Sequence, residues 1–327
     1  MPERFAAIVI GRNEGERLLR CLASLEGAMP LIYVDSGSTD GSREAARARG
    51  VEVVELDLTK PFTAARARNA GLERLRAIAP DAAFVQLVDG DCEIRSTWIE
   101  TARSFLETRP EVAVVCGRRR ERFPEATPYN AHCDREWDTP VGEARACGGD
   151  ALMRVQALSE VGDYNPTLIA GEEPEMCVRL RKAGWKIWRI DAEMTWHDAA
   201  MTRFGQFWKR ARRAGHAYAE GAYLHGAAPY HHNVAQTRRA LLWGLYLPLA
   251  LLLGALLLSP WILLGFLIYP VQILRLARKE TARYGSLRTA LEHAAFLTIG
   301  KLPEAIGICE FHLRRLTGKR AGIMEYK

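Results

Sequence analysis

The chain has 327 residues, of which 48% are hydrophobic and 26% charged, a composition that excludes a disordered protein and allows one large domain with an appendage. Its net charge is +6, so we expect an acidic partner such as nucleotide phosphates, anionic lipid or nucleic acid. The seven cysteines are scattered without a C-x-x-C pair, which argues against a zinc site.

Apolar runs that predict buried strands alternate with segments of helical periodicity over the first ninety residues. The apolar runs cover residues 5–10, 31–34 and 84–88, residues 51–56 are predicted to form a further strand, and the helical segments cover residues 18–25, 40–49 and 61–78. This alternation predicts an α/β fold, with a mostly parallel sheet and helices on both faces. Ligands of such sheets bind beyond the carboxyl ends of the strands.

Polar residues stand where these apolar runs end. They are Asn13, Glu14, Asp35, Asp89 and Asp91. Asp89 and Asp91 are one residue apart, and two carboxylates in one cleft repel each other unless a cation lies between them. The cation that suits oxygen ligands and substrate phosphates is Mg²⁺ or Mn²⁺. A solvated turn is the alternative, because Asp-Gly-Asp is also good turn chemistry.

The middle of the chain carries weaker signals. We expect a helix over residues 96–108, a strand over 112–115, a strand after Gly148 and Gly149, and a short helix over 155–161. The basic run Arg118-Arg119-Arg120 is interpreted as a solvated, partly paired loop. Residues 123–147 contain three prolines and are interpreted as an irregular excursion that faces the substrate.

An acidic segment, Gly171-Glu172-Glu173-Pro174-Glu175, begins a further helix. Proline is tolerated in the first turn of a helix, and the helix dipole favours acidic residues there, which explains the glutamates structurally. The functional alternative is that one of these carboxylates is a general base that points into the cleft. The residues alone leave both interpretations open.

These motifs, in this order, resemble those of the family-two glycosyltransferases, which are inverting enzymes with the GT-A fold that use nucleotide-diphosphate sugars. The resemblance covers roughly residues 5–200 and rests on Ile8 to Glu14, the loop from Val34 to Ser42, Arg68-Asn69-Ala70-Gly71, Asp89-Gly90-Asp91 and Gly171-Glu172-Glu173. Together with the apolar C-terminal segments, the acidic motif is most similar to membrane-anchored bacterial enzymes of exopolysaccharide or capsule assembly, of the succinoglycan type.

The resemblance implies a role for each matching residue. The nucleotide would be bound by Asn13, Glu14, Asp35, Arg68 and Asp89, with Asp35 at the base. The metal, Mg²⁺ or Mn²⁺, would be bound by Asp91, with Asp89 and His197 as further ligands. Glu173 would be the catalytic base that deprotonates the acceptor hydroxyl. Because Glu173 replaces the usual Asp of the family, Glu172 and Glu175 remain alternates.

The last third of the chain is expected to meet a membrane. Residues 201–237 contain a basic amphipathic helix with Phe204, Phe207 and Trp208 on its apolar face, which is typical of a helix on an anionic membrane surface. Packing of this helix on the catalytic domain is the alternative. The tail, residues 280–327, is predicted to be interfacial, with a helix from Pro303 whose apolar face carries Ile306, Cys309, Leu313 and Leu316.

A membrane hairpin is predicted within residues 238–279. Its uncharged segments, residues 241–258 and 261–274, are separated by Ser259-Pro260. Basic residues flank both outer ends and none lies at the turn, which fits a hairpin with both ends in the cytoplasm. A hairpin that enters the bilayer without crossing it would leave the same sequence.

The sequence therefore predicts a catalytic domain over residues 1–200 that acts as an inverting, metal-dependent glycosyltransferase at the cytoplasmic face of a bacterial inner membrane. The expected donor is a nucleotide sugar, with UDP as the expected nucleotide, and the expected acceptor is a hydroxyl of a lipid-linked (polyprenyl) saccharide. The alternatives are transfer to polyprenyl phosphate itself, and a membrane-anchored subunit that binds nucleotide sugar without turnover. We expect no nucleic-acid partner, because the positive charge clusters beside the membrane segments.

Overall fold

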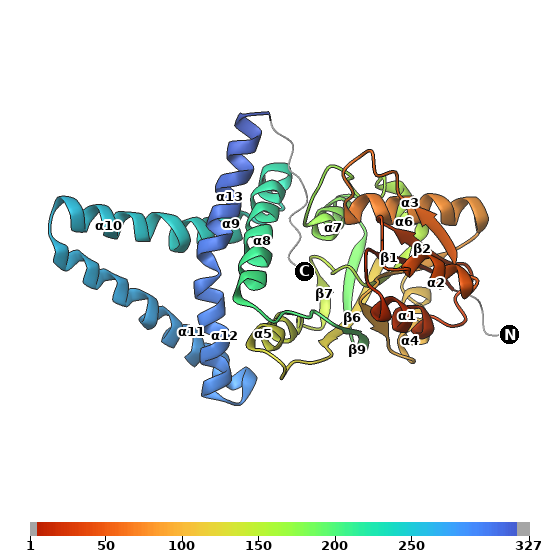
Figure 1. The fold of residues 1–327 in the computed structure, drawn as a ribbon, viewed down its shortest axis with the longest axis horizontal. Helices are drawn as coiled ribbons and strands as arrows, with labels where there is room; N and C mark the ends of the chain where they lie inside the picture. Colours follow the sequence, from red (N-terminus) through yellow and green to blue (C-terminus); the bar gives the residue numbers. More distant parts are fainter. Residues whose placement is uncertain (1–4, 319–327) are drawn as a thin grey trace. The chain divides into compact units, whose positions relative to one another are not determined.

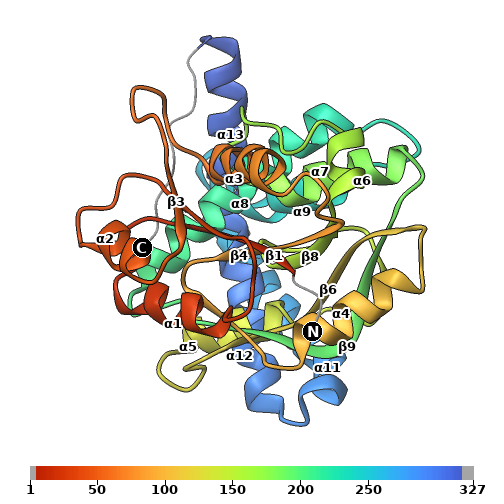
Figure 2. The ribbon, with the colours of Figure 1, turned by 90° about the vertical axis from the view of Figure 1, so that its right-hand side faces the viewer.

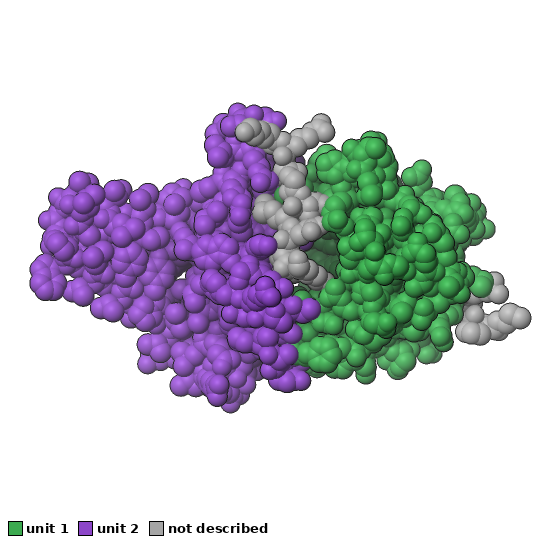
Figure 3. Space-filling model, in the orientation of Figure 1, with its two compact units in different colours: residues 1–123, 136–199 green, residues 124–135, 200–327 purple. Residues whose placement is uncertain are grey.

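The computed structural model describes residues 5–318. The chain divides into two compact units, one formed by residues 1–123 and 136–199 and the other by residues 124–135 and 200–327 (Figure 3). The first unit contains the sheet, and the second is helical.

The sheet of the first unit is mixed. Strands β3 (Glu52–Glu55), β2 (Leu31–Asp35), β1 (Ala6–Gly11) and β4 (Phe84–Asp89) are parallel and lie side by side in that order. Next to β4 lies β8 (Ala151–Arg154), then β6 (Val112–Glu121), both pairings being antiparallel. β9 (Lys186–His197) is parallel to β6, and the short strands β5 (Cys92–Ile94) and β7 (Gly142–Ala144) are antiparallel to β9.

Helices cover both faces of this sheet, as the sequence predicts. Figure 2 shows α3 (Ala64–Ile78), α6 (Val155–Glu160) and α7 (Glu172–Lys182) above the sheet, and α1 (Glu16–Ser24) and α4 (Trp98–Glu107) below it. A short helix, α2 (Ser42–Ala48), connects β2 to β3. Residues such as Ile8, Val34 and Leu87 are buried within the strands because both faces are covered. The predicted α/β class is confirmed.

Two predictions for the middle of the chain are wrong. The run from Arg118 to Arg120 is no solvated loop but part of β6, and the Arg118 side chain is buried. Its charges are met by residues far away in the sequence: Arg119 pairs with Asp150 at 2.8 Å and Arg120 with Glu193 at 2.8 Å. Residues 123–147 are not irregular throughout, because they contain α5 (Pro128–Glu136) and β7.

The second unit is a helical assembly from which a hairpin extends (Figure 1). Its elements are α8 (Phe204–His225), α9 (Val234–Leu241), the π-helical turn η1 (Leu242–Tyr246), α10 (Leu247–Leu257), the 3₁₀ segment η2 (Pro260–Leu267), α11 (Ile268–Tyr284), α12 (Leu287–Ile299) and α13 (Lys301–Leu316). In the described part of the chain, the helical stretches Val234–Leu257 and Pro260–Tyr284 are long and apolar enough to cross a membrane.

Glycines let α8 and α13 approach until their backbones touch. A Cβ atom on Gly215 would lie 2.0 Å from the carbonyl oxygen of Glu304, and one on Gly307 would lie 2.0 Å from that of Arg212. An ion pair between Arg212 and Glu310 also joins the two helices. No residue larger than glycine fits at these crossing points without moving a helix.

The two amphipathic helices use their predicted apolar faces differently. On α8, Phe207 and Ala211 are buried within the second unit instead of facing outward, while Phe204 remains exposed. On α13 a different face, with Ile308 and Phe311, is buried, while the predicted apolar face with Ile306 and Leu313 is exposed; its place at a membrane interface stays a prediction. Residues 319–327 of the predicted tail lie outside the described residues.

Candidate active site

The polar residues predicted to share one rim do so because of strand register. β1 pairs with β2 so that Gly11 lies beside Asp35, and with β4 so that Ile10 lies beside Asp89. Since the three strands are parallel, their carboxyl ends and the loops that follow meet at one edge of the sheet. The loops carrying Asn13 and Asp91 begin at this edge.

Two of these loops are tied together by side-chain hydrogen bonds. The Asp35 carboxylate accepts hydrogen bonds from the backbone N–H groups of Gly37 and Ser38 and from the Tyr33 hydroxyl, each at 2.9 Å. Asn13, in a left-handed conformation with φ of 56°, accepts from the backbone N–H of Thr39 at 2.8 Å. The nearby Glu14 forms an ion pair with Arg17 at 2.8 Å. These contacts hold the two loops to each other at this part of the rim.

Arg68, from α3, gathers three carboxylates around one buried guanidinium. Its side chain is 2% exposed and lies 2.6 Å from Glu173, 2.8 Å from Asp89 and 3.1 Å from Glu172. Burial raises the pKa of Glu173 to about 7, although the Arg68 charge opposes the shift; Glu172 and Asp89 add to it. The sequence motifs at 68, 89 and 171–173 thus converge on one ionic cluster.

The three glutamates at the start of α7 differ in accessibility. The Glu173 side chain is 13% exposed, while those of Glu172 and Glu175 are 5% and 4% exposed. Glu175 is also engaged by Arg179, whose Nε and Nη2 donate to its carboxylate at 2.9 to 3.0 Å. Of the three, Glu173 is therefore the carboxylate that a ligand can reach most readily.

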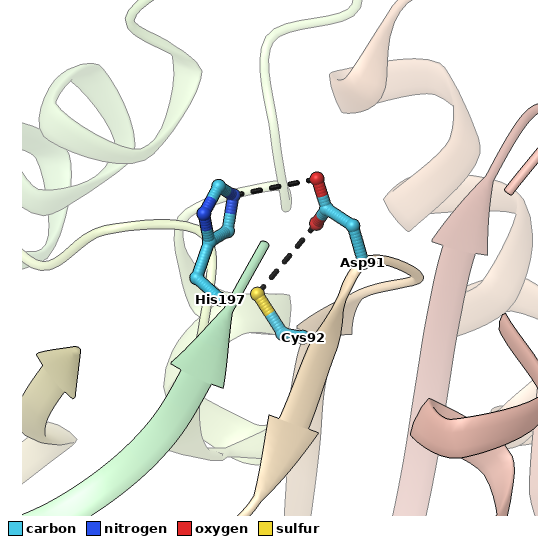
Figure 4. A group of neighbouring side chains, drawn as sticks. All are labelled: Asp91, Cys92 and His197. Carbon is cyan, nitrogen blue, oxygen red and sulfur yellow. Dashed lines mark hydrogen bonds and ion pairs between the residues drawn. The ribbon is translucent and has the colours of Figure 1, made fainter. Parts of the chain in front are cut away.

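Asp91 and His197 form a second cluster (Figure 4). His197 ends β9 and lies beside Cys92 of β5, so the imidazole Nε2 comes within 3.3 Å of the Asp91 carboxylate. The Cys92 thiol lies 3.6 Å from the same carboxylate, and potential ligand atoms of the three residues all lie within 4.8 Å of one another. The backbone N–H of Asp198 donates to the Asp91 carbonyl at 3.1 Å, which fixes the strand end to the loop.

The donor atoms of this cluster suit a divalent cation. A carboxylate oxygen and an imidazole nitrogen are ligands of Mn²⁺, and the carboxylate also suits Mg²⁺. The other imidazole nitrogen, Nδ1, is buried without a hydrogen bond and lies 3.6 Å from the buried carboxylate of Glu121. Asp89 is outside this cluster and pairs with Arg68, so the two carboxylates of Asp-Gly-Asp have different partners.

The site also contains residues that were not predicted from the sequence. Asp150 is fully buried, accepts from the backbone N–H of Asp89 at 3.1 Å, and pairs with Arg119 at 2.8 Å. Gly149 lies so close to the cluster that a Cβ atom would sit 2.6 Å from Asp89 Oδ2. The glycine pair before a strand was a signal of close backbone approach, but nothing local in the sequence indicated what approaches it.

Known proteins resemble the chain in sequence. A family model described as glycosyl transferase family 2 matches residues 6–162. The succinoglycan biosynthesis protein ExoA of Rhizobium meliloti is 28% identical over 172 residues, which cover 49% of this chain and about half, 51%, of ExoA. Glycosyltransferase AglE of Haloferax volcanii is 23% identical over 226 residues, covering 64% of this chain and 72% of AglE.

Solved structures share the fold. The mannosyltransferase PcManGT from Pyrobaculum calidifontis, in complex with GDP-Man and Mn²⁺, superposes with a TM-score of 0.56 at 19% identity, over 97% of this chain and 89% of that one. Residues 1–349 of S. aureus TarS, in complex with UDP-GlcNAc, give a TM-score of 0.51 at 15% identity, over 97% and 93%. The resemblance expected from the motifs is confirmed, although the family match ends before the acidic segment at 171–175: residues 6–162 of this chain are a glycosyl transferase family 2 domain with the GT-A fold.

Proposed function

We propose that the protein is an inverting glycosyltransferase that takes a sugar from a nucleotide-diphosphate donor with the help of a divalent cation. The observation that carries this proposal is that two clusters, one around Asp91 and His197 and one around Arg68, lie at the same edge of the sheet. Asp91 and His197 offer ligand atoms 3.3 Å apart, and Glu173, partly exposed beside Arg68, offers a carboxylate with a raised pKa.

In this proposal Asp91 and His197 would hold the cation, which would supply positive charge to stabilise the leaving diphosphate. Asn13, Glu14 and Asp35 line the nucleoside site, with Asp89 and Arg68 beside the ribose. Glu173 accepts the proton of the acceptor hydroxyl while the acceptor oxygen bonds to the anomeric carbon. The bond from that carbon to the diphosphate breaks, and the diphosphate leaves with the electron pair. A single displacement of this kind inverts the anomeric centre and needs no protein nucleophile.

We further propose that the acceptor is lipid-linked and that the protein acts on the cytoplasmic face of an inner membrane. In each of its two long apolar stretches, little of the most apolar 18-residue window is buried in the protein: 11% in the first and 6% in the second. These stretches are therefore not core helices. Arg238, Arg239, Arg275 and Arg278 flank their outer ends, which favours the cytoplasmic side. ExoA, by name a succinoglycan biosynthesis protein, supports a polysaccharide product.

Nucleoside-diphosphate release by the detergent-purified protein tests the proposal. A panel of UDP- and GDP-sugars is assayed with a bacterial lipid extract, with and without Mn²⁺ or Mg²⁺. We expect release from one donor that requires metal, lipid and Asp91. The Asp91→Ala variant is compared with Asp191→Ala, because the Asp191 side chain is 92% exposed. Release that withstands both a chelator and Asp91→Ala would overturn the metal site.

The same assay separates the alternatives. A Glu173→Gln variant that keeps full activity would indicate transfer to polyprenyl phosphate, because a phosphate acceptor needs no base. Absence of release with every donor, despite metal-dependent nucleotide binding, would indicate a binding subunit.

A further inference from the structure

The apolar hairpin of the second unit has a definite base. At Gly244 the first helical stretch crosses α13 so closely that a Cβ atom would lie 1.9 Å from the Lys301 carbonyl oxygen. Ala240, one turn earlier, is buried in a cluster with Ile308 and Phe311 of α13. On the return, Ala277 of α11 packs against Ala290 and Ala294 of α12. The free part of the hairpin, which we call the arm, is therefore residues 245–272.

The arm is shorter than the hydrocarbon core of a bilayer. From Gly244 to Leu257 the helix advances about 20 Å at 1.5 Å per residue. The return from Pro260 to Gln272, the end of the arm, is part 3₁₀ and part α and advances about 22 Å. The core is about 30 Å thick, and a helix that spans it needs about 20 apolar residues, more than either side of the arm supplies.

The base of the arm carries charge that resists entry into the core. Figure 1 shows α12 and α13 running crosswise to the arm. The Arg288 and Glu292 side chains of α12 are 90% and 40% exposed, and Lys301 of α13 pairs with Glu304 at 2.7 Å. Moving a charged side chain from water into the hydrocarbon core is unfavourable because the core offers it no compensating hydrogen bonds. These charges therefore keep the base of the arm out of the hydrocarbon core, so the arm cannot reach further by carrying its base into the core.

The tip of the arm exposes apolar side chains that suit the hydrocarbon core of a bilayer. Leu256, Leu257, Leu258 and Trp261 are 74% to 81% exposed, and residues 240–274 contain no charged side chain. In a spanning hairpin these leucines would face water on the far side. The turn also satisfies backbone groups internally: the N–H groups of Leu258 and Ser259 donate to the Gly254 carbonyl at 2.9 and 3.2 Å.

The two sides of the arm are joined within its apolar length. Pro248 has no N–H to donate to the preceding turn, which is π-helical. The hydroxyl of Tyr269, on the returning side, donates to the carbonyl of Trp243 at 2.6 Å. Gly265 allows Leu251 to pack against its backbone. The two sides of the hairpin are thus in contact with each other.

From the length of the arm, the charged base and the apolar tip, we propose that the arm enters the bilayer from one face and turns around inside it, so that no described part of the chain reaches the opposite face. The lipid acyl chains are its only partner. The inference rests on the membrane attachment proposed above, but on neither the donor nor the chemistry.

Cysteine labelling in sealed vesicles of both orientations tests this. The background is Cys309→Ser, because Cys309 is exposed while the other cysteines are buried. Ser259→Cys marks the tip and Arg288→Cys marks the base. We expect a membrane-impermeant maleimide to label the base from one face only, and the tip from neither face until detergent is added.

Each other result overturns the proposal. Tip labelling from the face opposite the base would show a spanning hairpin, and tip labelling from the same face would show an arm that lies in water. Extraction by alkaline carbonate is measured on the same vesicles, and release of the protein would refute membrane insertion itself. A nitroxide at the tip gives a second measurement, in which we expect greater accessibility to oxygen than to a water-soluble nickel chelate. Retained nucleotide binding shows that each variant is folded.

Discussion

The guanidinium of Arg68 can neutralise only one of the three carboxylates that contact it. The carboxylates of Glu172, Glu173 and Asp89 lie 2.6 to 3.1 Å from its nitrogens, on α7 and β4. With all three ionised, the cluster carries excess negative charge in a buried place. Protonation of Glu173, whose pKa burial raises to about 7, relieves this charge.

A pH profile follows for the proposed base. Because Glu173 acts only when deprotonated, we expect kcat/KM to rise with pH and level off above about 7. The Glu173→Gln variant is expected to lose about 100-fold or more in kcat and to lose this acid limb. Steady-state rates from pH 5 to 9 measure both. If the Glu173→Gln variant keeps the same acid limb in its pH profile of kcat/KM, the limb is caused by a group other than Glu173.

The same shift predicts how stability depends on pH. The pKa of Glu173 in the folded protein exceeds the ordinary value of 4.5, so the folded form holds this proton more tightly than the unfolded form. Its contribution to the free energy of unfolding is complete below pH 4.5 and declines as the pH rises through about 7. In Glu173→Gln we expect this decline to be absent. Denaturant unfolding at a series of pH values compares the two proteins.

Neighbouring glycines give a matched test of the Asp89 cluster. A Cβ atom at Gly149 would lie 2.6 Å from Asp89 Oδ2 and 2.7 Å from Arg68 Nη2, while one at Gly148 would lie 3.6 Å from its nearest neighbour. We expect Gly149→Ala to lower kcat/KM at least about tenfold by displacing these groups, and Gly148→Ala to have little effect. Equal losses in both would mean that the loop, and not the cluster, is sensitive.

At the scale of elements, α8 and α13 are in backbone contact at two glycines, Gly215 and Gly307. Overpacking of a close contact costs about 1 to 3 kcal/mol, so we expect Gly307→Ala to lower the thermal unfolding temperature. The control is Gly205→Ala in the first turn of α8, where a Cβ atom meets nothing within 4 Å. Thermal unfolding in detergent compares them. An unchanged Gly307→Ala protein would show that the helices slide apart without cost.

The elements that the sequence predicts well are those whose signal is local. β1, β2 and β4 are continuous apolar runs, and α7 begins with acidic residues at its first turn, so pattern alone locates them. β6 was predicted too short, because its charged half is stabilised by residues far away in the sequence, such as Asp150 and Glu193.

In the candidate site, too, the local features were predictable from the sequence and the contacts between distant residues were not. The motifs predict which residues belong to it, and strand register places Asp35 and Asp89 together. The pairing inside it was not predictable from spacing, since Asp89 turns to Arg68 and Asp91 to His197 although only Gly90 separates them. Asp150 was missed because a buried carboxylate is recognisable only once its partners are known.

For the whole molecule, attachment to the membrane and donor binding are predicted to be separable. Changing Leu256, Leu257 and Leu258 together to Glu places three charges at the tip, so we expect loss of membrane retention and of transfer to lipid, with nucleotide binding unchanged. Changing the same residues to Ile keeps the tip apolar and is the control. Carbonate extraction measures membrane retention, a transfer assay measures transfer to lipid, and nucleotide titration measures donor binding. If the Glu variant still resists extraction by carbonate, other surfaces of the protein attach it to the membrane.

The path of the chain limits how the protein can be shortened. Residues 124–135, which include most of α5, belong to the second unit although both flanking stretches belong to the first. There Tyr129 lies 5.6 Å, and His132 4.9 Å, from the ring of Phe296. A truncated protein ending near residue 200 would lack Phe296 and leave these rings without their cover. We expect it to aggregate on expression, and a soluble version to require the helices around α5 as well as the sheet.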